Sequence, residues 1–414
     1  MLSYDLNPEH EMLRKSIREF AEKEIKPVRQ KLDEKEEFSY DLVEKMGKMG
    51  LFGITVSPDY GGQGLDTLSY IIAVEELARV DGCQAATVAA ENGLGIGPIY
   101  NFGTEEQKRK YLPDLCSGKK LWGFGLTEPG AGSDAGNSST RGELKNGKWT
   151  INGAKIFITN AASKITNGVT VQCVTGIKNQ PQRGVEGEAP SGLPVEGATC
   201  LPAGTARAPM ITGKEISCVI VESGTPGFTA KEMHHKMTWR SSNTAELYFD
   251  NAQVPEKNLL GRRGDGYRQM LATLDGGRLA IAAMGLGGAQ GAYEAALAYA
   301  QERKTFGQTL TKHQTIAFKL ADMAMEIDLA RTYLYKACWL KDQGRPFKKE
   351  AAIAKLYTSE MMGRVADAAV QIHGGYGLME EYPVAKFYRD QRLLEIGEGS
   401  SEVQRIVISR LIGC

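Results

Sequence analysis

Several features that mark other classes of protein are missing from this chain of 414 residues. Lys and Arg together number 50, as do Asp and Glu, so no net charge attracts the chain to nucleic acid or to anionic lipid. No apolar run approaches the roughly 18 residues that a membrane span needs. The N-terminus lacks the apolar stretch of a signal peptide, and the acid-rich segment after it is unlike a transit peptide. We therefore expect neither a membrane span nor a nucleic-acid partner.

Cysteine and histidine are too scattered to suggest a metal site or a disulfide framework. The seven cysteines form no CxxC pair, and the five histidines form no HExxH motif, although His234 and His235 are adjacent. We predict no metal site, and this cysteine usage favours the reducing cytoplasm. The cysteines are Cys83, Cys116, Cys173, Cys200, Cys218, Cys338 and Cys414.

The chain is longer than one hydrophobic core usually supports, and its residue patterns change twice. Residues 1–120 read as an N-terminal helical domain. Asn7 followed by Pro8 is a helix start, and Pro27 ends that helix. Apolar periodicity predicts two further helices, over 40–49 and 67–80.

Residues 121–250 change to the pattern of short strands and predict a middle antiparallel β domain. Asn146-Gly147 and Asn152-Gly153 are both hairpin signals beside strand-like segments. Residues 178–213 hold five of the 15 prolines, which predicts an irregular insertion within this domain.

Residues 251–414 return to long helical patterns. Apolar residues recur at alternating steps of three and four from Ile316 to Ala337, as in a helix of a bundle that ends near Gly344. Two more helices are expected over 275–303 and 350–372. The order of helices, strands and helices predicts an α+β fold.

Two segments of the middle domain are candidates for binding a ligand. The segment LTEPGAGSD at 126–134 combines small residues, which allow close approach of the backbone, with hydroxyls, although a surface turn has the same composition. In KIFITN at 155–160, strand alternation places Phe157 and Thr159 on one face. That face could cover a flavin ring, or it could belong to an ordinary half-buried strand.

Two further candidates lie in the C-terminal region. Asp275 and Arg278 share a helix face, either as an ion pair or as a contact for a phosphorylated carrier. Glu398 stands between Gly397 and Gly399, and because glycine costs about 1 kcal/mol within a helix, a loop is expected there. Such a loop could present a carboxylate to a ligand, although a lone glutamate is usually a solvated charge.

Taken together and in order, the motifs of the chain resemble those of the acyl-CoA dehydrogenase family over nearly its whole length. The segments that carry this resemblance are YGGQG at 60–64, KYLP at 110–113, LTEPGAGSD at 126–134, KIFITN at 155–160, KMTWR at 236–240, LDGGR at 274–278, RKTFG at 303–307, QIHGG at 371–375 and IGEGSSEVQ at 396–404.

The resemblance implies an acyl-CoA dehydrogenase-like fold, with an N-terminal helical domain, a middle antiparallel β domain and a C-terminal four-helix bundle. It also implies a flavoprotein that binds one FAD per subunit of a homotetramer. Positions that match those around the isoalloxazine ring are Phe124, Leu126, Thr127, Phe157 and Thr159. Positions assigned to the ADP part of the FAD of a neighbouring subunit are Arg303, Phe306, Gln314, Gln371, Gly374 and Gly375.

The remaining matched positions concern the phosphates and the substrate. Ser400 matches a residue at the FAD phosphates, and Ser133 matches one at the boundary between flavin and CoA. Asp275 and Arg278 match CoA-contacting positions. Glu398 matches the family's catalytic glutamate, whereas relatives of the isovaleryl type carry the base at the position that is Gly277 here.

The implied reaction is the oxidation of an acyl-CoA thioester to the 2-enoyl-CoA. Glu398 removes the α-proton while the β-hydride passes to flavin N5. An electron-transfer flavoprotein is the expected electron acceptor.

Substrate choice is expected to depend on departures from the family pattern. Gly397 replaces a tyrosine that many relatives have beside the base, and the arginine of the glutaryl-CoA type is missing around 84–88. The insertion at 178–213 is either a lid over the acyl pocket or a loop far from it. We expect a branched, cyclic or aryl-substituted acyl-CoA such as benzylsuccinyl-CoA. Alternatives are a short straight-chain (butyryl-type) substrate, an acyl-CoA oxidase, or a non-catalytic acyl-CoA-binding protein.

Overall fold

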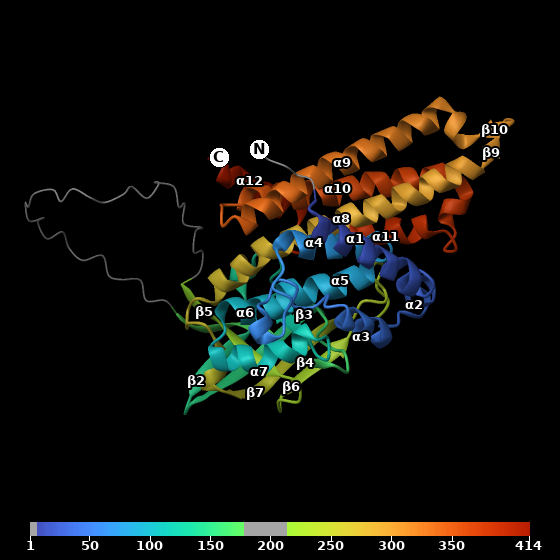
Figure 1. Cartoon of the computed structure of the whole chain (residues 1–414). Coiled ribbons are helices and arrows are strands. Elements are labelled where there is room, and N and C mark those ends of the chain that lie inside the picture. The colour runs from blue at the N-terminus through green and yellow to red at the C-terminus, as the bar shows by residue number, and fades with distance from the viewer. Residues whose placement is uncertain (1–5, 178–212) are drawn as a thin grey trace, which may run out of the picture.

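A computed structural model of the chain describes residues 6–177 and 213–414. Helices from both ends of the sequence pack together, and the strands between them form a separate layer below the C-terminal helices (Figure 1). The insertion predicted at 178–213 lies outside the described residues, apart from residue 213.

The three predicted N-terminal helices are confirmed as α1 (Pro8–Phe20), α3 (Tyr40–Lys48) and α4 (Thr67–Ala78). The helix α1 begins where expected, because the Asn7 side chain accepts a hydrogen bond of 2.8 Å from His10 N. It continues as a π-helix over Ala21–Ile25. Elements that were not predicted are α2 (Arg29–Lys35), α5 (Gly82–Ala90), a π-helix (Glu91–Ile96), α6 (Gly97–Phe102) and α7 (Glu105–Cys116).

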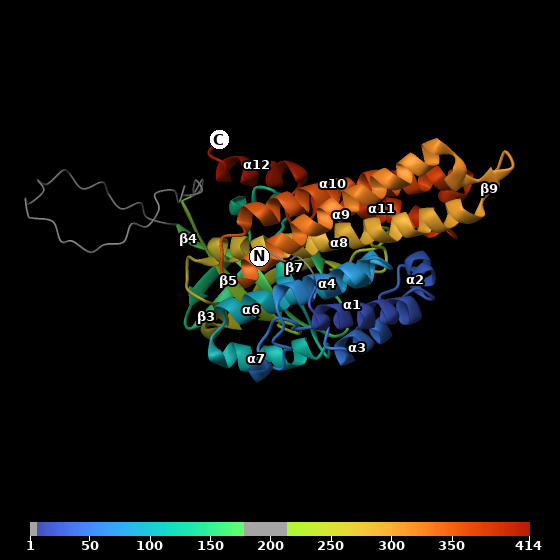
Figure 2. The same cartoon turned by 45° about the horizontal axis from the view of Figure 1, so that its top comes forward.

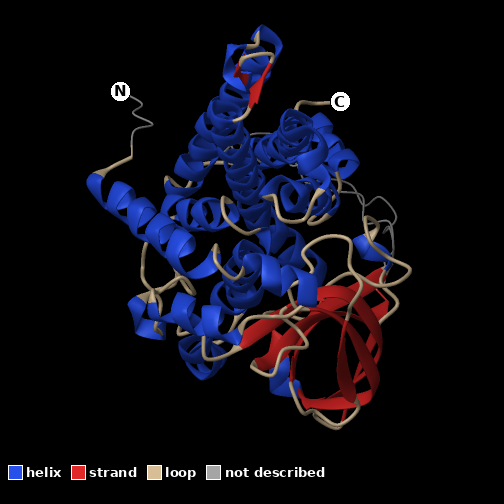
Figure 3. Cartoon of the chain, turned by 90° about the vertical axis from the view of Figure 1, so that its right-hand side faces the viewer, coloured by secondary structure: helices blue, strands red, loops and turns tan. Residues whose placement is uncertain are grey.

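Eight strands of the described residues form one sheet, which curls together at a corner of the molecule (Figure 3). The order is β6-β7-β3-β2-β4-β5-β8, with β1 paired to β4. Most pairs are antiparallel as predicted, but β4 pairs in parallel with both β1 and β2. The strands are β1 (Leu121–Gly125), β2 (Arg141–Lys145), β3 (Lys148–Thr159), β4 (Thr166–Ile177), β5 (Lys214–Glu222), β6 (Phe228–Glu232), β7 (Thr244–Pro255) and β8 (Leu259–Leu260).

Of the two predicted hairpin turns, one is confirmed and one is wrong. Asn146 and Gly147 both have positive φ, and they join β2 to β3 in the expected tight turn. Asn152 and Gly153 instead lie inside β3, where the pairing with β7 shifts register. Gly153 serves close packing rather than a turn, because a Cβ on it would overlap Thr140.

The C-terminal helices pack along one long central helix, α8 (Gly266–Glu302), which runs beside α4, α9, α10 and α11 (Figures 1 and 2). It begins well before the predicted start at residue 275. The other elements are the hairpin β9 (Lys304–Thr305) and β10 (Gln308–Thr309), α9 (Gln314–Asp342), α10 (Lys348–His373), α11 (Pro383–Ile396) and α12 (Ser401–Leu411). Within 6–177 and 213–414, no helix is both long and apolar enough to cross a bilayer.

A largely buried lysine joins the three parts of the chain. Lys386 on α11 lies 3.0 Å from Asp81 and 3.5 Å from Asp33, and it also pairs with Asp390. Asp390 accepts a hydrogen bond of 2.9 Å from the backbone of Trp239, in the loop before β7. Cys83 lies beside the same ammonium group. Asp81, Cys83 and Asp390 are close enough together to hold a metal ion, but the ammonium group of Lys386 lies among them.

Candidate active site

Glu398 lies in the short loop between α11 and α12, as the flanking glycines predicted. Its φ is 52° and that of Gly399 is 94°, so two consecutive residues adopt the left-handed conformation. For a glutamate this conformation is costly, and residues held in this way cluster at functional sites.

The carboxylate of Glu398 points toward α8. Its Oε2 atom is buried and has no hydrogen-bond partner among the described residues. A Cβ built on Gly277 would overlap that oxygen, so the carboxylate occupies space that only glycine leaves free. A buried acceptor without a donor is rare in folded proteins and suggests a group reserved for a ligand or a reaction.

The surroundings of Glu398 bring its titration to neutral pH. Burial raises the pKa of the Glu398 carboxyl to about 7, whereas the positive charges of Lys355 and Arg278 lower it. Tyr70 on α4 is near enough for the charge of Glu398 to affect it. Burial and this charge raise the pKa of the Tyr70 hydroxyl well above its ordinary value. The base candidate therefore faces α4, α8 and α10.

Asp275 and Arg278 form the predicted ion pair on α8. Arg278 Nη1 donates to Asp275 Oδ1 at 2.5 Å, and Lys348 lies 3.2 Å from the other oxygen of Asp275. Arg278 is only 4% exposed, and its Nε has no partner among the described residues. The pair leaves this N–H available for a ligand, so the ion-pair interpretation does not exclude the binding one.

Sequence reasoning missed Lys355, which lies in α10 and is fully buried. Its Nζ donates a hydrogen bond of 2.8 Å to the Gly399 carbonyl, next to the base candidate. Burial lowers the pKa of Lys355 to about 8, and this effect exceeds the opposing effect of the Glu398 charge. A usable signal was its position among alanines on the inner side of a helix, at Ala351, Ala352 and Ala354.

The residues predicted around a flavin ring gather where β1 ends beside β3. Phe124 and Leu126 are buried, and the Thr127 carbonyl accepts a hydrogen bond of 2.9 Å from Ile156 N. Beyond that bond β3 contains a bulge, and Phe157 there has a φ of 62° and is 63% exposed. Thr159 follows at the end of the strand. An exposed aromatic ring on a strained backbone is suited to cover the face of a planar ligand. These residues therefore fit an isoalloxazine ring.

The loop after β1 is fixed by a buried ion pair that sequence reasoning also missed. Lys155 Nζ lies 2.7 Å from Glu128 Oε1, and both side chains are buried. Glu128 also accepts hydrogen bonds from Ser139 N and Thr140 N. Burial alone would raise the pKa of Glu128, but Lys155 and the hydroxyl groups of Ser138 and Ser139 hold it far below its usual range. Ser133, in the segment that follows Glu128, is exposed.

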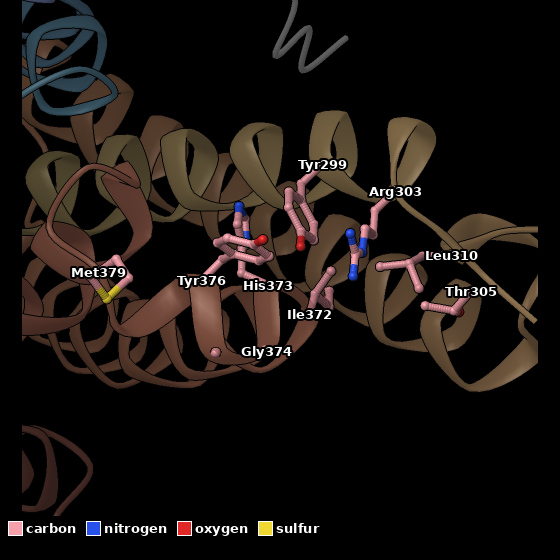
Figure 4. A pocket seen from close by; sticks show the side chains of 10 residues that line it. Tyr299, Arg303, Thr305, Leu310, Ile372, His373, Gly374, Tyr376 and Met379 are labelled. Atoms are coloured by element: carbon pink, nitrogen blue, oxygen red, sulfur yellow. The ribbon is translucent and has the colours of Figure 1, made fainter.

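A second set of predicted cofactor residues lies around the C-terminal ends of α8 and α10, where Figure 4 shows a pocket. An open pocket of about 600 Å³ is lined by Arg303, Gly374 and Gly375, where the rings of Tyr299 and His373 stack. Phe306 is 97% exposed in the β9–β10 hairpin, and Gln314 and Gln371 are exposed beyond the pocket lining. Gly277 and Arg303 are 26 residues apart along α8, which corresponds to roughly 39 Å. The pocket is therefore remote from Glu398.

Ser400 and Gly397 flank the base candidate. Ser400 caps α12 by accepting a hydrogen bond from Val403 N, which leaves the N-terminus of that helix beside Glu398. A helix N-terminus favours phosphate, in keeping with the predicted role of Ser400. A Cβ built on Gly397 would lie 3.1 Å from the Leu393 side chain. The space predicted beside Gly397 is thus partly taken by α11 itself.

Comparison with known proteins assigns the whole chain to one family. Three family models match in order, described as acyl-CoA dehydrogenase, N-terminal domain (residues 7–119), middle domain (123–187) and C-terminal domain (264–413). The chain is 47% identical over 409 residues to the probable acyl-CoA dehydrogenase YngJ of Bacillus subtilis, with 99% of each chain covered.

Solved structures agree in both fold and extent. Butyryl-CoA dehydrogenase from Megasphaera elsdenii superposes with a TM-score of 0.87 and 39% identity, over 99% of this chain and 100% of that one. A chain from the structure of the electron transferring flavoprotein of Acidaminococcus fermentans gives a TM-score of 0.88 and 39% identity, over 100% of both chains. The chain therefore belongs to the acyl-CoA dehydrogenase family of FAD-dependent oxidoreductases, which act on CH–CH bonds.

Proposed function

We propose that this chain converts an acyl-CoA thioester to its 2-enoyl-CoA, with Glu398 as the base that removes the α-proton. One observation carries the proposal: the Oε2 atom of Glu398 is buried and lacks a hydrogen-bond donor among the described residues, and burial raises the pKa of this carboxyl to about 7. A general base works best when its pKa lies near the operating pH. The left-handed backbone fixes its position before substrate binds.

FAD, when bound, supplies the acceptor for the β-hydride. The residues proposed to hold its ring system are Phe124, Leu126, Thr127, Phe157 and Thr159, and Ser400 at the start of α12 would meet the phosphates. Glu398 holds the proton once it has been removed, and burial favours that protonated state. Asp275, Arg278 and Ser133 are proposed to contact CoA, and for Arg278 this is supported by its buried Nε, which has no partner among the described residues.

The proposed substrate is a short straight-chain acyl-CoA. The similarity to butyryl-CoA dehydrogenase over the full length of both chains supports it. The expectation of benzylsuccinyl-CoA or another aryl-substituted substrate gains no support from these relatives. Its main structural argument, open space beside Gly397, is weakened by the contact with Leu393. The other argument, a lid at 178–213, concerns residues outside the described ranges.

We propose a homotetramer in which one subunit completes the FAD site of another. The sheet that carries the proposed flavin-ring residues contacts the start of α8, where Gly266 packs against Ser217, whereas the Arg303 pocket lies at the other end of that helix, roughly 39 Å from Gly277. A single FAD would not bridge this span within one subunit, so the Arg303 pocket is free to serve a neighbour. On α9, Phe318, Met325 and Leu329 share an exposed face, which suits subunit contact.

An electron-transfer flavoprotein is the proposed acceptor, supported by the structure of that flavoprotein from Acidaminococcus fermentans, one chain of which this chain matches in full. The proposed compartment is the cytoplasm, and five buried free thiols among the described residues accord with a reducing environment.

A panel of thioesters assayed with an artificial acceptor tests the proposed activity. Butyryl-CoA is expected to give a higher kcat/KM than octanoyl-CoA, isovaleryl-CoA or benzylsuccinyl-CoA. A preference for benzylsuccinyl-CoA would overturn the short-chain proposal. Equal turnover with oxygen alone would indicate the oxidase, and a colourless protein that oxidises none of the thioesters would indicate a non-catalytic binding protein.

A further inference from the structure

Lys355 is a charged side chain in a place where such side chains are rarely found. It is fully buried in α10, and burial of an ammonium group is costly unless the group is paired or hydrogen-bonded. Its hydrogen bond is to the Gly399 carbonyl at 2.8 Å, in the loop that carries Glu398. The lysine therefore connects α10 to the backbone of the active-site loop.

The Gly399 carbonyl is held from two sides. Gln404, which is fully buried in α12, donates from Nε2 to the same oxygen at 2.9 Å and to the Glu398 carbonyl at 3.3 Å. Together, Lys355 and Gln404 constrain two consecutive left-handed residues that would otherwise relax. This arrangement fixes the direction in which the Glu398 side chain leaves the backbone.

Lys355 also acts on Glu398 through its charge. Among the described residues no ion pair joins Nζ to the carboxylate, so the effect crosses space within a low-dielectric site. Arg278 faces Glu398 from α8 with the same sign, and Tyr70 lies nearby on α4. The negative charges of Glu395 on α11 and of Glu360 on α10 favour the charged form of Lys355.

We propose that Lys355 is a positioning residue for Glu398, which holds the Gly399 carbonyl with its ammonium group and favours the ionised carboxylate from behind the loop. The inference rests on the proposed role of Glu398 as the base. A purely structural lysine would stabilise the fold without affecting the charge state of the base.

The pH dependence of kcat/KM for butyryl-CoA separates these roles. In Lys355→Met the acidic limb should move to higher pH by about one unit or more, because an opposite charge close to a carboxylate lowers its pKa by about 1–3 units. At pH values well below the limb, kcat/KM of Lys355→Met should be about tenfold lower than that of wild type. At high pH the two values should converge. Lys355→Arg, which keeps the charge and can donate to the same carbonyl, should restore most of the wild-type limb.

Lys386→Met is the matched control, because it removes another largely buried lysine that contacts Asp33, Asp81 and Asp390 rather than the active-site loop. It should lower the melting temperature and leave the acidic limb in place. A second readout is the infrared carboxyl band of the enzyme, titrated with pH and identified by its loss in Glu398→Gln. That band should titrate at higher pH in Lys355→Met than in wild type.

The outcomes distinguish this inference from the proposed function. Full activity in Glu398→Gln would show that Glu398 is not the base, and the inference about Lys355 would then be overturned as well. If Glu398→Gln is inactive while Lys355→Met keeps the wild-type limb and the wild-type carboxyl titration, the base stands and the role of Lys355 is overturned. A limb that moves equally in Lys386→Met would also overturn it, since loss of stability alone would then explain the shift.

Discussion

The carboxylate of Glu398 lies against Gly277, so closely that a Cβ at position 277 would overlap its Oε2 atom. The two residues come from distant parts of the chain, the loop before α12 and the first third of α8. The resemblance to this family implies that relatives of the isovaleryl type carry the base at the position of Gly277. In this chain the two positions exclude each other sterically, because an acid at one needs the space that the glycine at the other leaves free.

Gly277→Ala tests this relationship. The added methyl group should displace Glu398 and reduce kcat by roughly tenfold to a hundredfold, since misplacement of a catalytic group by about 1 Å can cost that much. Stability should change by no more than about 1 kcal/mol, because alanine also favours the helix by about that amount. Gly276→Ala is the matched control, as its Cβ would meet only Lys341 Nζ, at 3.7 Å. Equal activity in both variants would contradict the steric account.

The raised pKa of Glu398 predicts how stability depends on pH. Folding raises this pKa from 4.5 to about 7, so the folded chain holds a proton that the unfolded chain has released. The contribution of Glu398 to stability therefore falls as pH rises from about 4.5 to 7, by on the order of 3 kcal/mol. Glu398→Gln should be more stable than wild type at pH 8, and the gain should shrink toward pH 5. Urea unfolding at both pH values measures this, and a pH-independent difference would be inconsistent with a buried, titrating Glu398.

Assembly and cofactor binding should depend on each other. Leu329→Lys places a charge on the exposed apolar face of α9, so light scattering should give a smaller particle than the expected tetramer, with less flavin bound per chain. Met12→Lys changes an exposed apolar residue of α1 and should leave both values unaltered. A wild-type monomer with full flavin occupancy would rule out the shared FAD site.

The loop around Glu398 was predictable because glycine reports backbone requirements directly. Two glycines around Glu398 indicated a loop, and the structure has one. The helix expected over 275–303 begins earlier, at Gly266, so Gly276 and Gly277 lie inside α8. A glycine inside a helix here serves the carboxylate of Glu398, a contact between distant parts of the chain that local propensity does not contain.

Other features depend on tertiary contacts and left only weak local signals. Asn152-Gly153 has the composition of a hairpin turn, yet close packing against Thr140 keeps it within β3. The bulge in β3 that exposes Phe157 could not be predicted, because the alternation of residue types around it is that of a regular strand. Lys355 was missed because lysine is normally solvated, and only the alanines around it indicate a buried position.

The central claim is that Glu398 removes the α-proton, and exchange of that proton with solvent tests it most directly. A 3-thia-acyl-CoA, in which sulfur replaces Cβ and no double bond can form, is incubated with enzyme in D₂O, and incorporation of deuterium at Cα is followed by NMR. The wild type should catalyse the exchange, and Glu398→Gln should slow it by about 10²–10⁴-fold, the usual contribution of a general base. Exchange in Glu398→Gln within a few-fold of wild type would contradict the claim and place the base elsewhere.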